Sequence, residues 1–475
     1  MPAVDLMSST GTPATLSAET IEALGGGLRG VLCMPGEPGY DQARTIWNAM
    51  IERRPGAVVR AAGASDVIRA VKLAAEQKLV LSIRGGGHSI AGNAVCDGGL
   101  MLDLTPMKSV RVDPHARTAR VEPGVVLGEL DHETQAFGLA TPLGINSTTG
   151  VAGLTLGGGF GWISRKYGLT IDNLRAVDVV TAEGELLTAN EKKNPDLFWA
   201  VRGGGGNFGV ATSFEFKLHR VGPQVLCGAI VHPLEQAREL LPQYREFVAS
   251  AAEEVSAWVV IRKAPPLPFL PQAWHGREIL IFGVCVVGGI SRAKKSIAPL
   301  RALGKPIADV IAPQPYAAWQ RMFDPLLAPG GRNYWKSHDF LKLDDGIFDA
   351  VLDAAGRLPS PETEIVLIHL GGAVNRVPAD ATAYPHRDAE FMMNLHTRWS
   401  DSALDQACIG WARGLFEATK PFSTGGVYVN FMPEDEAARV RQGAYARNYE
   451  KLARIKAQYD PGNLFRMNQN IVPAA

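Results

Sequence analysis

The stretch Ile83-Arg84-Gly85-Gly86-Gly87-His88-Ser89 continues an apolar run that begins at Leu79. The run predicts a buried β-strand, and the three glycines predict a loop whose backbone can approach a ligand closely. Successive backbone N–H groups in such a loop can point at one anion, and phosphates are common ligands of such sites. The residues alone leave two interpretations of His88 open: a member of a ligand site, or a histidine that caps the loop by hydrogen bonding.

Two further glycine clusters, residues 157–161 and 203–209, lie downstream of this loop. The spacing G-x-G-x-x-G of dinucleotide-binding folds occurs twice, at Gly25, Gly27 and Gly30 and at Gly204, Gly206 and Gly209. That fingerprint requires a strand before the glycines and a helix after them. The first match follows a helix-like stretch, and the second runs into the strand-like alternation of 210–216. We therefore do not predict a classical dinucleotide-binding site.

The pattern changes after about Val221. Three long strand-like runs, Ser256 to Arg262, Ile279 to Val287 and Glu364 to Leu370, are separated by amphipathic helical stretches. Long strands with long helical insertions predict a second domain of the α+β class.

The composition is that of a globular protein of two or three domains. The chain has 475 residues, of which 46% are hydrophobic and 20% charged, and single cores stop growing near ~250–300 residues. Its 48 Lys and Arg balance its 48 Asp and Glu, so we do not expect the basic face of a general nucleic-acid binder. No cysteine pair or histidine cluster predicts a metal site.

The expected location is the cytoplasm. The five cysteines are widely spaced, which favours buried free thiols in a reducing compartment. The N-terminal stretch lacks the pattern of a signal peptide. The longest apolar run, Ile279 to Ile290, is shorter than the ~20 residues that span a bilayer, so no membrane segment is expected.

The glycine–histidine stretch resembles the covalent-flavin loop of FAD-linked oxidases of the vanillyl-alcohol oxidase (PCMH) type, and the chain resembles their berberine-bridge-enzyme-like branch. The same resemblance extends through Gly150-Val151-Ala152-Gly153-Leu154, Trp199-Ala200-Val201-Arg202, Tyr459-Asp460-Pro461-Gly462-Asn463-Leu464-Phe465 and Asn468-Gln469-Asn470-Ile471. It implies an α+β fold with a two-part FAD-binding domain, residues 1–220 and 425–475. The inserted residues 221–424 would form a substrate domain, an antiparallel sheet backed by helices.

The resemblance also implies a cofactor, FAD, bonded covalently to the ring of His88. The residues that it assigns to cofactor binding are Arg84, Gly85, Gly86, Gly87, His88, Ser89, Gly150, Val151, Gly153, Gly157, Gly158, Gly159, Asn207, Gly209, Asn468 and Gln469. Some members attach the flavin a second time through a cysteine just before the second glycine loop. Residues 143–150 contain no cysteine, so a single attachment is expected.

The segment Gly426-Val427-Tyr428-Val429-Asn430 reads as a strand that returns toward the flavin, and the family places a Tyr and an Asn of this kind beside the flavin ring. Tyr428 could act as a base if a nearby cation or the flavin lowered its pKa, and Asn430 could bond a flavin or substrate oxygen. Other polar candidates lie on strand-like runs of the predicted substrate domain: His369, Tyr334 and Lys336. For each of these a structural role remains open.

The resemblance implies an enzyme that removes a hydride from a small molecule, an alcohol, an amine or a sugar, and returns the electrons to O2 as hydrogen peroxide. Two alternatives remain: a dehydrogenase of the same fold with another electron acceptor, and a flavin-holding protein without turnover. The sequence does not select the substrate or the oligomeric state.

Overall fold

The apolar run before the glycine–histidine loop forms β5 (Leu81–Arg84), an edge strand of a four-stranded sheet in a computed structural model that describes residues 3–475. The sheet has the order β3-β4-β6-β5, with β3 spanning Val31–Cys33, β4 Ala57–Arg60 and β6 Leu100–Asp103. β4 and β5 both run parallel to β6. Parallel strands need a crossover connection, and α3 (Ala64–Glu76) provides it by burying one apolar stripe against the sheet.

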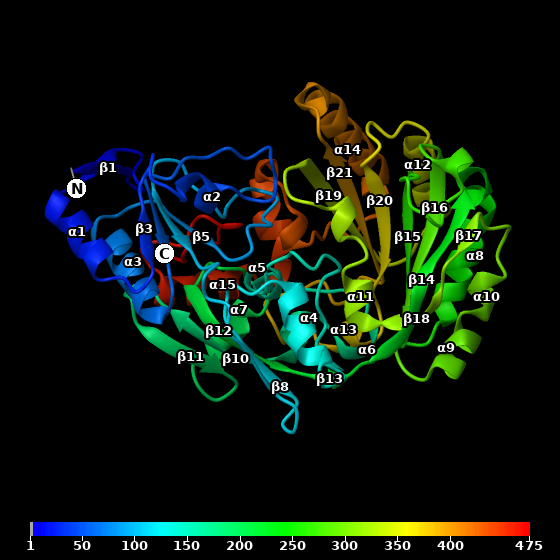
Figure 1. The fold of residues 1–475 in the computed structure, drawn as a ribbon, viewed down its shortest axis with the longest axis horizontal. Coiled ribbons are helices and arrows are strands. Elements are labelled where there is room, and N and C mark those ends of the chain that lie inside the picture. Colours follow the sequence, from blue (N-terminus) through cyan, green and yellow to red (C-terminus); the bar gives the residue numbers. More distant parts are fainter. Residues whose placement is uncertain (1–2) are drawn as a thin grey trace.

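A second, antiparallel sheet lies beside the first and has the order β11-β10-β12-β8-β7 (Figure 1). Its strands are β7 (Val110–Asp113), β8 (Thr118–Val121), β10 (Leu174–Val180), β11 (Leu186–Asn190) and β12 (Val210–Lys217). The helices that pack into the same core are α4 (Leu127–Gln135), α5 (Val151–Leu156), α7 (Pro195–Val201) and α15 (Tyr449–Tyr459).

The second lobe is built on an eight-stranded antiparallel sheet with the path β17-β14-β16-β15-β20-β21-β19, and β18 pairs with β14. Its long strands are β14 (Gln224–Pro233), β15 (Val255–Lys263), β16 (Glu278–Val286), β19 (Arg332–Phe340), β20 (Glu364–His369) and β21 (Phe391–Trp399). The strands predicted at 256–262, 279–287 and 364–370 are thus confirmed. All these strands lie inside the predicted segment 221–424.

Helices cover one face of this sheet: α8 (Ala237–Ser250), α12 (Asp345–Ala355) and α14 (Asp405–Thr419). Because side chains alternate along a strand, Val259, Ile365 and Leu367 pack under the helices. Trp258 and Val366 point the other way, toward the first lobe.

The remaining elements are short or peripheral. They are β1 (Val4–Met7), β2 (Pro13–Leu16), α1 (Ala18–Gly26), α2 (Tyr40–Arg44), β9 (Leu139–Ala140), α6 (Ser164–Tyr167), β13 (His219–Arg220), α9 (Ile290–Ser296), α10 (Ala298–Arg301), β17 (Ala308–Asp309), β18 (Ala312–Pro315), α11 (Tyr316–Gln320) and α13 (Ala373–Arg376).

The chain returns to the first lobe after α14, so the red C-terminal segment lies among the blue and cyan elements of the N-terminal half (Figure 1). The strand predicted at 426–430 is wrong. Tyr428 has extended backbone, but residues 429–431 form a 3₁₀ turn closed by a bond from Phe431 N to Tyr428 O. This segment crosses from one lobe to the other and has no neighbouring strand with which to pair.

The fold is therefore of the α+β class, with mixed and antiparallel sheets in two lobes joined by two crossings of the chain. Within residues 3–475, no helix is both long enough and apolar enough to cross a membrane.

Candidate active site

One large cavity lies between the two lobes. The first lobe contributes the glycine–histidine loop, the loop before α5, and residues 205–206 and 209–211. The second lobe contributes the open face of β15, β19, β20 and β21. The C-terminal crossing at 428–432 and the tail at 467–469 close the remaining sides. Segments far apart in the sequence thus meet around one space.

His88 lines this cavity and stacks on Trp47, with ring centroids 4.9 Å apart and an interplanar angle of 19°. Its Nε2 lies 3.1 Å from the Thr148 hydroxyl oxygen. Burial, with smaller contributions from the charges of Arg398 and Arg84, lowers the pKa of His88 to about 3, although the contact with Thr148 raises it. The ring is therefore neutral at physiological pH.

The hydrogen bonds around Thr148 decide which nitrogen of His88 carries the hydrogen. The Thr148 hydroxyl donates to Asn146 Oδ1 at 2.7 Å, and the Thr148 backbone N–H donates to the same oxygen at 3.0 Å. Because a hydroxyl has one hydrogen, His88 Nε2 must donate to Thr148. A neutral ring protonated on Nε2 has its lone pair on Nδ1, and that nitrogen is the nucleophile.

The glycines of the first two loops allow the backbones to touch. A Cβ at Gly86 would lie 2.4 Å from the backbone of Gly150, and one at Gly150 would meet Gly86 equally closely. Gly87 has a φ of +72°, a conformation that favours glycine. The contact between these loops therefore requires the residues that the sequence provides.

Most of the residues predicted to bind the cofactor line the cavity. They are Gly85, Gly86, Gly87, His88, Ser89, Gly150, Gly153, Gly209, Asn468 and Gln469. The other predicted residues are not part of the cavity lining: Arg84, Val151, Gly157, Gly158, Gly159 and Asn207.

These remaining residues support the cavity wall rather than form it. Val151 is buried in the core of the first lobe. Arg84 donates to Ala43 O and lies beneath Gly87. Asn207 donates to Gln469 O at 3.1 Å and accepts from Ile471 N at 3.0 Å, so it fixes the C-terminal tail at the cavity.

Tyr428 and Asn430 both line the cavity and are bonded to each other. The Tyr428 hydroxyl accepts from Asn430 Nδ2 at 2.9 Å and from Gly159 N at 3.0 Å. Burial raises the pKa of Tyr428 to about 12, against these two hydrogen bonds, and no cation contributes. Of the two conditions for a role as base, a nearby cation is missing among the described residues, and the flavin is the one that remains. Asn430 also donates to Leu154 O at 3.2 Å, which leaves its Oδ1 as an acceptor.

The other polar candidates do not line the cavity. His369 accepts a bond from the Arg165 guanidinium at 2.6 Å, and burial with that charge lowers its pKa to about 2. Lys336 is buried, not solvated, in an ion pair with Glu436 at 2.7 Å, and Tyr334 donates to Asp435. The cause is strand alternation: Trp335, between Tyr334 and Lys336, is the residue of β19 that faces the cavity.

Sequence reasoning missed part of the cavity wall. It consists of the aromatic residues Trp47, Phe160, Trp258, Trp335 and Phe431 and the polar residues Glu364, Asn394 and His396. A signal was present, because Asn394 and His396 are two apart in a run of apolar residues and must share one face of a strand.

Comparisons with known proteins agree with this geometry. Residues 55–190 match the family described as FAD binding domain, and residues 427–472 match the family described as berberine and berberine like. An FAD-linked oxidoreductase of Dictyostelium discoideum is 32% identical over 451 residues, which cover 94% of this chain and 95% of the relative. The chain belongs to the FAD-linked oxidoreductases of the berberine-bridge-enzyme-like type. It is an FAD-dependent oxidoreductase.

Two further relatives of this oxidoreductase are named for their activities. The (R)-6-hydroxynicotine oxidase of Paenarthrobacter nicotinovorans is 31% identical over 474 residues, covering 94% of this chain and 97% of that protein. The solved xylooligosaccharide oxidase of Myceliophthora thermophila, in complex with xylobiose, has a TM-score of 0.83 at 27% identity, and the match covers 96% and 99% of the two chains.

The residues of this oxidoreductase fit FAD. The glycine loops expose backbone N–H groups without side chains over them, and such backbone suits a pyrophosphate. His88 Nδ1 offers a lone pair. Among the described residues, no group of three His, Cys, Asp or Glu side chains could hold a metal ion.

Proposed function

We propose that this oxidoreductase is an oxidase that holds FAD through a single covalent bond from the His88 ring. It oxidises an alcohol, amine or sugar-type group of a small molecule and transfers the electrons to O2, with release of hydrogen peroxide. The observation that carries the proposal is the neutral His88 ring, whose hydrogen is held on Nε2 by Thr148. When bound, FAD supplies the hydride-accepting chemistry.

The cysteines support a single attachment and a reducing compartment. All five are free and buried, and none lines the cavity. A thioether to the cofactor would require a cysteine in the wall. Free buried thiols are typical of the cytoplasm, which we propose as the location.

The walls of the cavity favour hydride transfer over side reactions with water. Most of the lining is apolar, and the small residues Gly150, Ala152 and Gly153 beside the second glycine loop support the approach of O2. Tyr428 remains protonated, because its pKa is raised to about 12, and it holds Asn430 toward the cavity. The names of two relatives, a hydroxynicotine oxidase and a xylooligosaccharide oxidase, support oxidase activity on small molecules.

The test is to denature the purified protein in acid and ask whether flavin absorbance and fluorescence stay with the polypeptide. We expect retention in the wild type and loss in His88→Ala. Loss from the wild type would overturn the covalent bond, and absence of flavin from protein made in flavin-replete cells would overturn the proposal as a whole.

A second measurement separates the acceptors. Reduction of a dye without peroxide formation under air would indicate the dehydrogenase alternative. A flavin that stays oxidised with every candidate substrate under anaerobic conditions would indicate a binding protein.

A further inference from the structure

Three charged or polar side chains form a row across the open face of the second lobe. Arg262 on β15 is the register partner of Glu364 on β20, and Glu364 is the register partner of His396 on β21. Arg262 Nη1 lies 2.7 Å from Glu364 Oε2, and His396 Nδ1 lies 3.0 Å from Glu364 Oε1. Arg262 and His396 are buried, so solvent does not screen these contacts.

This row fixes which ring nitrogen of His396 carries a hydrogen toward Glu364. Burial opposes ionisation of Glu364, but Arg262 and His396 outweigh it and hold the carboxyl pKa below its usual value. An ionised carboxylate only accepts hydrogen bonds, so His396 Nδ1 carries the hydrogen that lies between them. In the neutral form of the ring, the lone pair is then on Nε2.

His396 Nε2 is buried and has no hydrogen-bond partner in residues 3–475, and the residue lines the cavity. Buried polar atoms without partners are rare in native proteins, and each one requires an explanation. Asn394 Oδ1, two residues away on the same face, is also buried without a partner. The two atoms are acceptors for a ligand with a hydrogen to donate.

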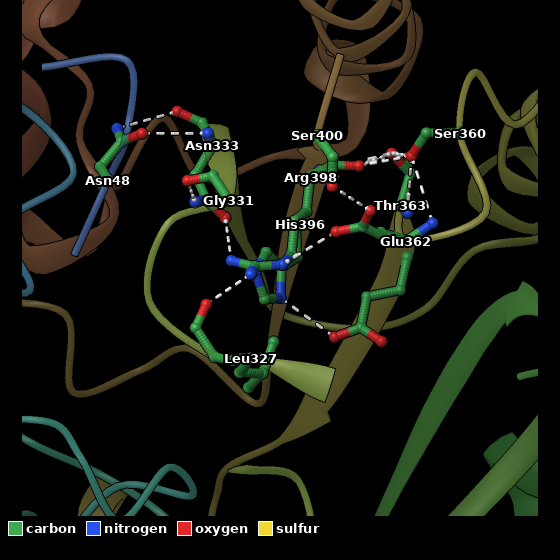
Figure 2. Close-up of polar contacts among 12 residues, drawn as sticks. Asn48, Leu327, Gly331, Asn333, Ser360, Glu362, Thr363, His396, Arg398 and Ser400 are labelled. Atoms are coloured by element: carbon green, nitrogen blue, oxygen red, sulfur yellow. Dashed lines mark hydrogen bonds and ion pairs between the residues drawn. The ribbon is translucent and has the colours of Figure 1, made fainter. Parts of the chain in front are cut away.

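The other groups around His396 do not compete for this nitrogen. Trp335 on β19 packs edge-on against the ring, with centroids 4.4 Å apart. Arg398 lies beside His396 on the same strand (Figure 2), but its guanidinium is bonded to Glu362 at 3.2 Å and to Asn333 at 3.4 Å. Its charge is therefore already neutralised by a partner.

A continuous belt of aromatic rings lines the cavity into which His396 Nε2 and Asn394 Oδ1 face. Trp258, Phe160, Phe431, Trp335 and Trp47 follow one another with centroid separations of 6.2, 5.9, 5.3 and 5.7 Å. All five line the cavity, and no Arg, Lys or Asp side chain of the described part of the chain does. We call these five residues the aromatic belt. It offers flat apolar contact, two indole N–H donors without partners in residues 3–475 (Trp258 and Trp335), and no cation to pair with an anionic group.

We infer that the substrate is a planar aromatic molecule whose ring carries a CH–OH or CH–NH group, held in the aromatic belt with that O–H or N–H donating to His396 Nε2. The inference rests on the proposed oxidase function. In the reaction, the O–H or N–H proton passes to His396 Nε2. The C–H hydrogen leaves with its electron pair to the flavin, a C=O or C=N bond forms, and the substrate loses the two electrons that the flavin gains. Glu364 stabilises the resulting imidazolium.

The first experiment measures binding alone. 2-Naphthol and cellobiose are titrated into the flavin-loaded protein, and quenching of tryptophan fluorescence and perturbation of the visible flavin spectrum are followed. We expect saturable binding of 2-naphthol and at least tenfold weaker binding of cellobiose. His396→Gln should weaken binding of 2-naphthol about tenfold. The matched control is His338→Gln, a histidine of the same sheet that packs under α14 against Phe416.

The second experiment measures flavin reduction without oxygen by 2-naphthalenemethanol and by xylobiose. We expect reduction by the aromatic alcohol only. Glu364→Gln, which keeps the shape but removes the charge, should slow it about 10²–10⁴-fold, as loss of general base catalysis does, with a smaller change in affinity. Tighter binding or faster reduction with the saccharides, or wild-type behaviour of both variants, would overturn the inference.

The outcomes separate this inference from the proposed function. Binding of 2-naphthol is read without turnover and without a covalent bond, so it can succeed if the flavin is retained only non-covalently. Conversely, a covalent flavin that is reduced by xylobiose and not by the aromatic alcohol would uphold the oxidase and contradict the substrate class.

Discussion

His88 Nε2 lies 3.1 Å from the hydroxyl of Thr148, which in turn donates to Asn146 Oδ1. This relay holds the hydrogen of the His88 ring on the nitrogen that faces Thr148. We therefore predict that Thr148→Val, which removes the hydroxyl at constant shape, slows covalent incorporation of flavin several-fold, whereas Thr148→Ser retains it. The covalent fraction is measured as flavin fluorescence in a denaturing gel.

The control for this prediction is Thr155→Val. The Thr155 hydroxyl is buried in the same region and has no hydrogen-bond partner among residues 3–475. Equal losses in the Thr148 and Thr155 variants would indicate a packing effect and remove the tautomer argument.

Tyr428 is predicted to position Asn430 rather than to accept a proton. Its pKa is raised to about 12, so it stays protonated throughout the working pH range. Tyr428→Phe leaves Gly159 N without its acceptor and removes one of the two acceptors of Asn430 Nδ2. An unsatisfied buried donor costs about 1–3 kcal/mol. We expect a lower midpoint in chemical denaturation and a smaller loss of kcat than in His396→Gln. A larger loss of kcat in Tyr428→Phe would reassign the base.

Buried neutral histidines should make the fold sensitive to acid. Burial lowers the pKa of His338 to about 4, and burial with the Arg165 charge lowers that of His369 to about 2. The unfolded chain binds protons at these residues near pH 6.5, while the folded protein does not. Stability is therefore complete above pH 6.5 and falls as the pH decreases toward 4, by up to about 1.4 kcal/mol per pH unit for each such histidine.

The acid prediction is checked by urea denaturation at pH 7 and pH 5. His338→Gln should reduce the loss of free energy of unfolding between these pH values by about 1–2 kcal/mol. The exposed His115→Gln should leave the loss unchanged, and an unchanged loss in His338→Gln as well would contradict the assignment.

The ion pair between Lys456 and Asp460 should be essential for holding the C-terminal tail in place. Both side chains are fully buried, their charged atoms lie 2.6 Å apart, and Lys456 Nζ also donates to Asn207 O at 2.6 Å. Removal of one partner leaves a buried charge, at a cost of about 3–5 kcal/mol. We expect Lys456→Met to lower the free energy of unfolding by that amount and to loosen the tail at Gln469.

The exposed pair of Lys420 and Glu417 serves as the reference for this variant. Pairs of this kind contribute about 0–1 kcal/mol, so Lys420→Met should have almost no effect. Similar effects of the two lysine variants on urea denaturation would show that the buried pair is not special.

The sequence by itself determined the features that depend on local chemistry. The strand before Gly85, the glycine loops and His88 could be placed because glycines at 85–87 permit a backbone that few other residues adopt. The long strands of the second lobe were also predictable, since runs of β-branched and aromatic residues favour extended chain. The motifs that follow one another along the chain likewise indicated the α+β fold and the FAD-linked family.

The tertiary structure decided which side chains face the substrate. Every residue of β21 is buried. Helices pack on one face of the strand, and its other face lines the cavity between the two lobes. Burial on both faces removes the alternation that would have distinguished His396 from its neighbours, and the same ambiguity made His369 and Lys336 plausible candidates. The row from Arg262 through Glu364 to His396 depends on the register of three strands. That register is set by long-range pairing between strands, and no local pattern in the sequence specifies it.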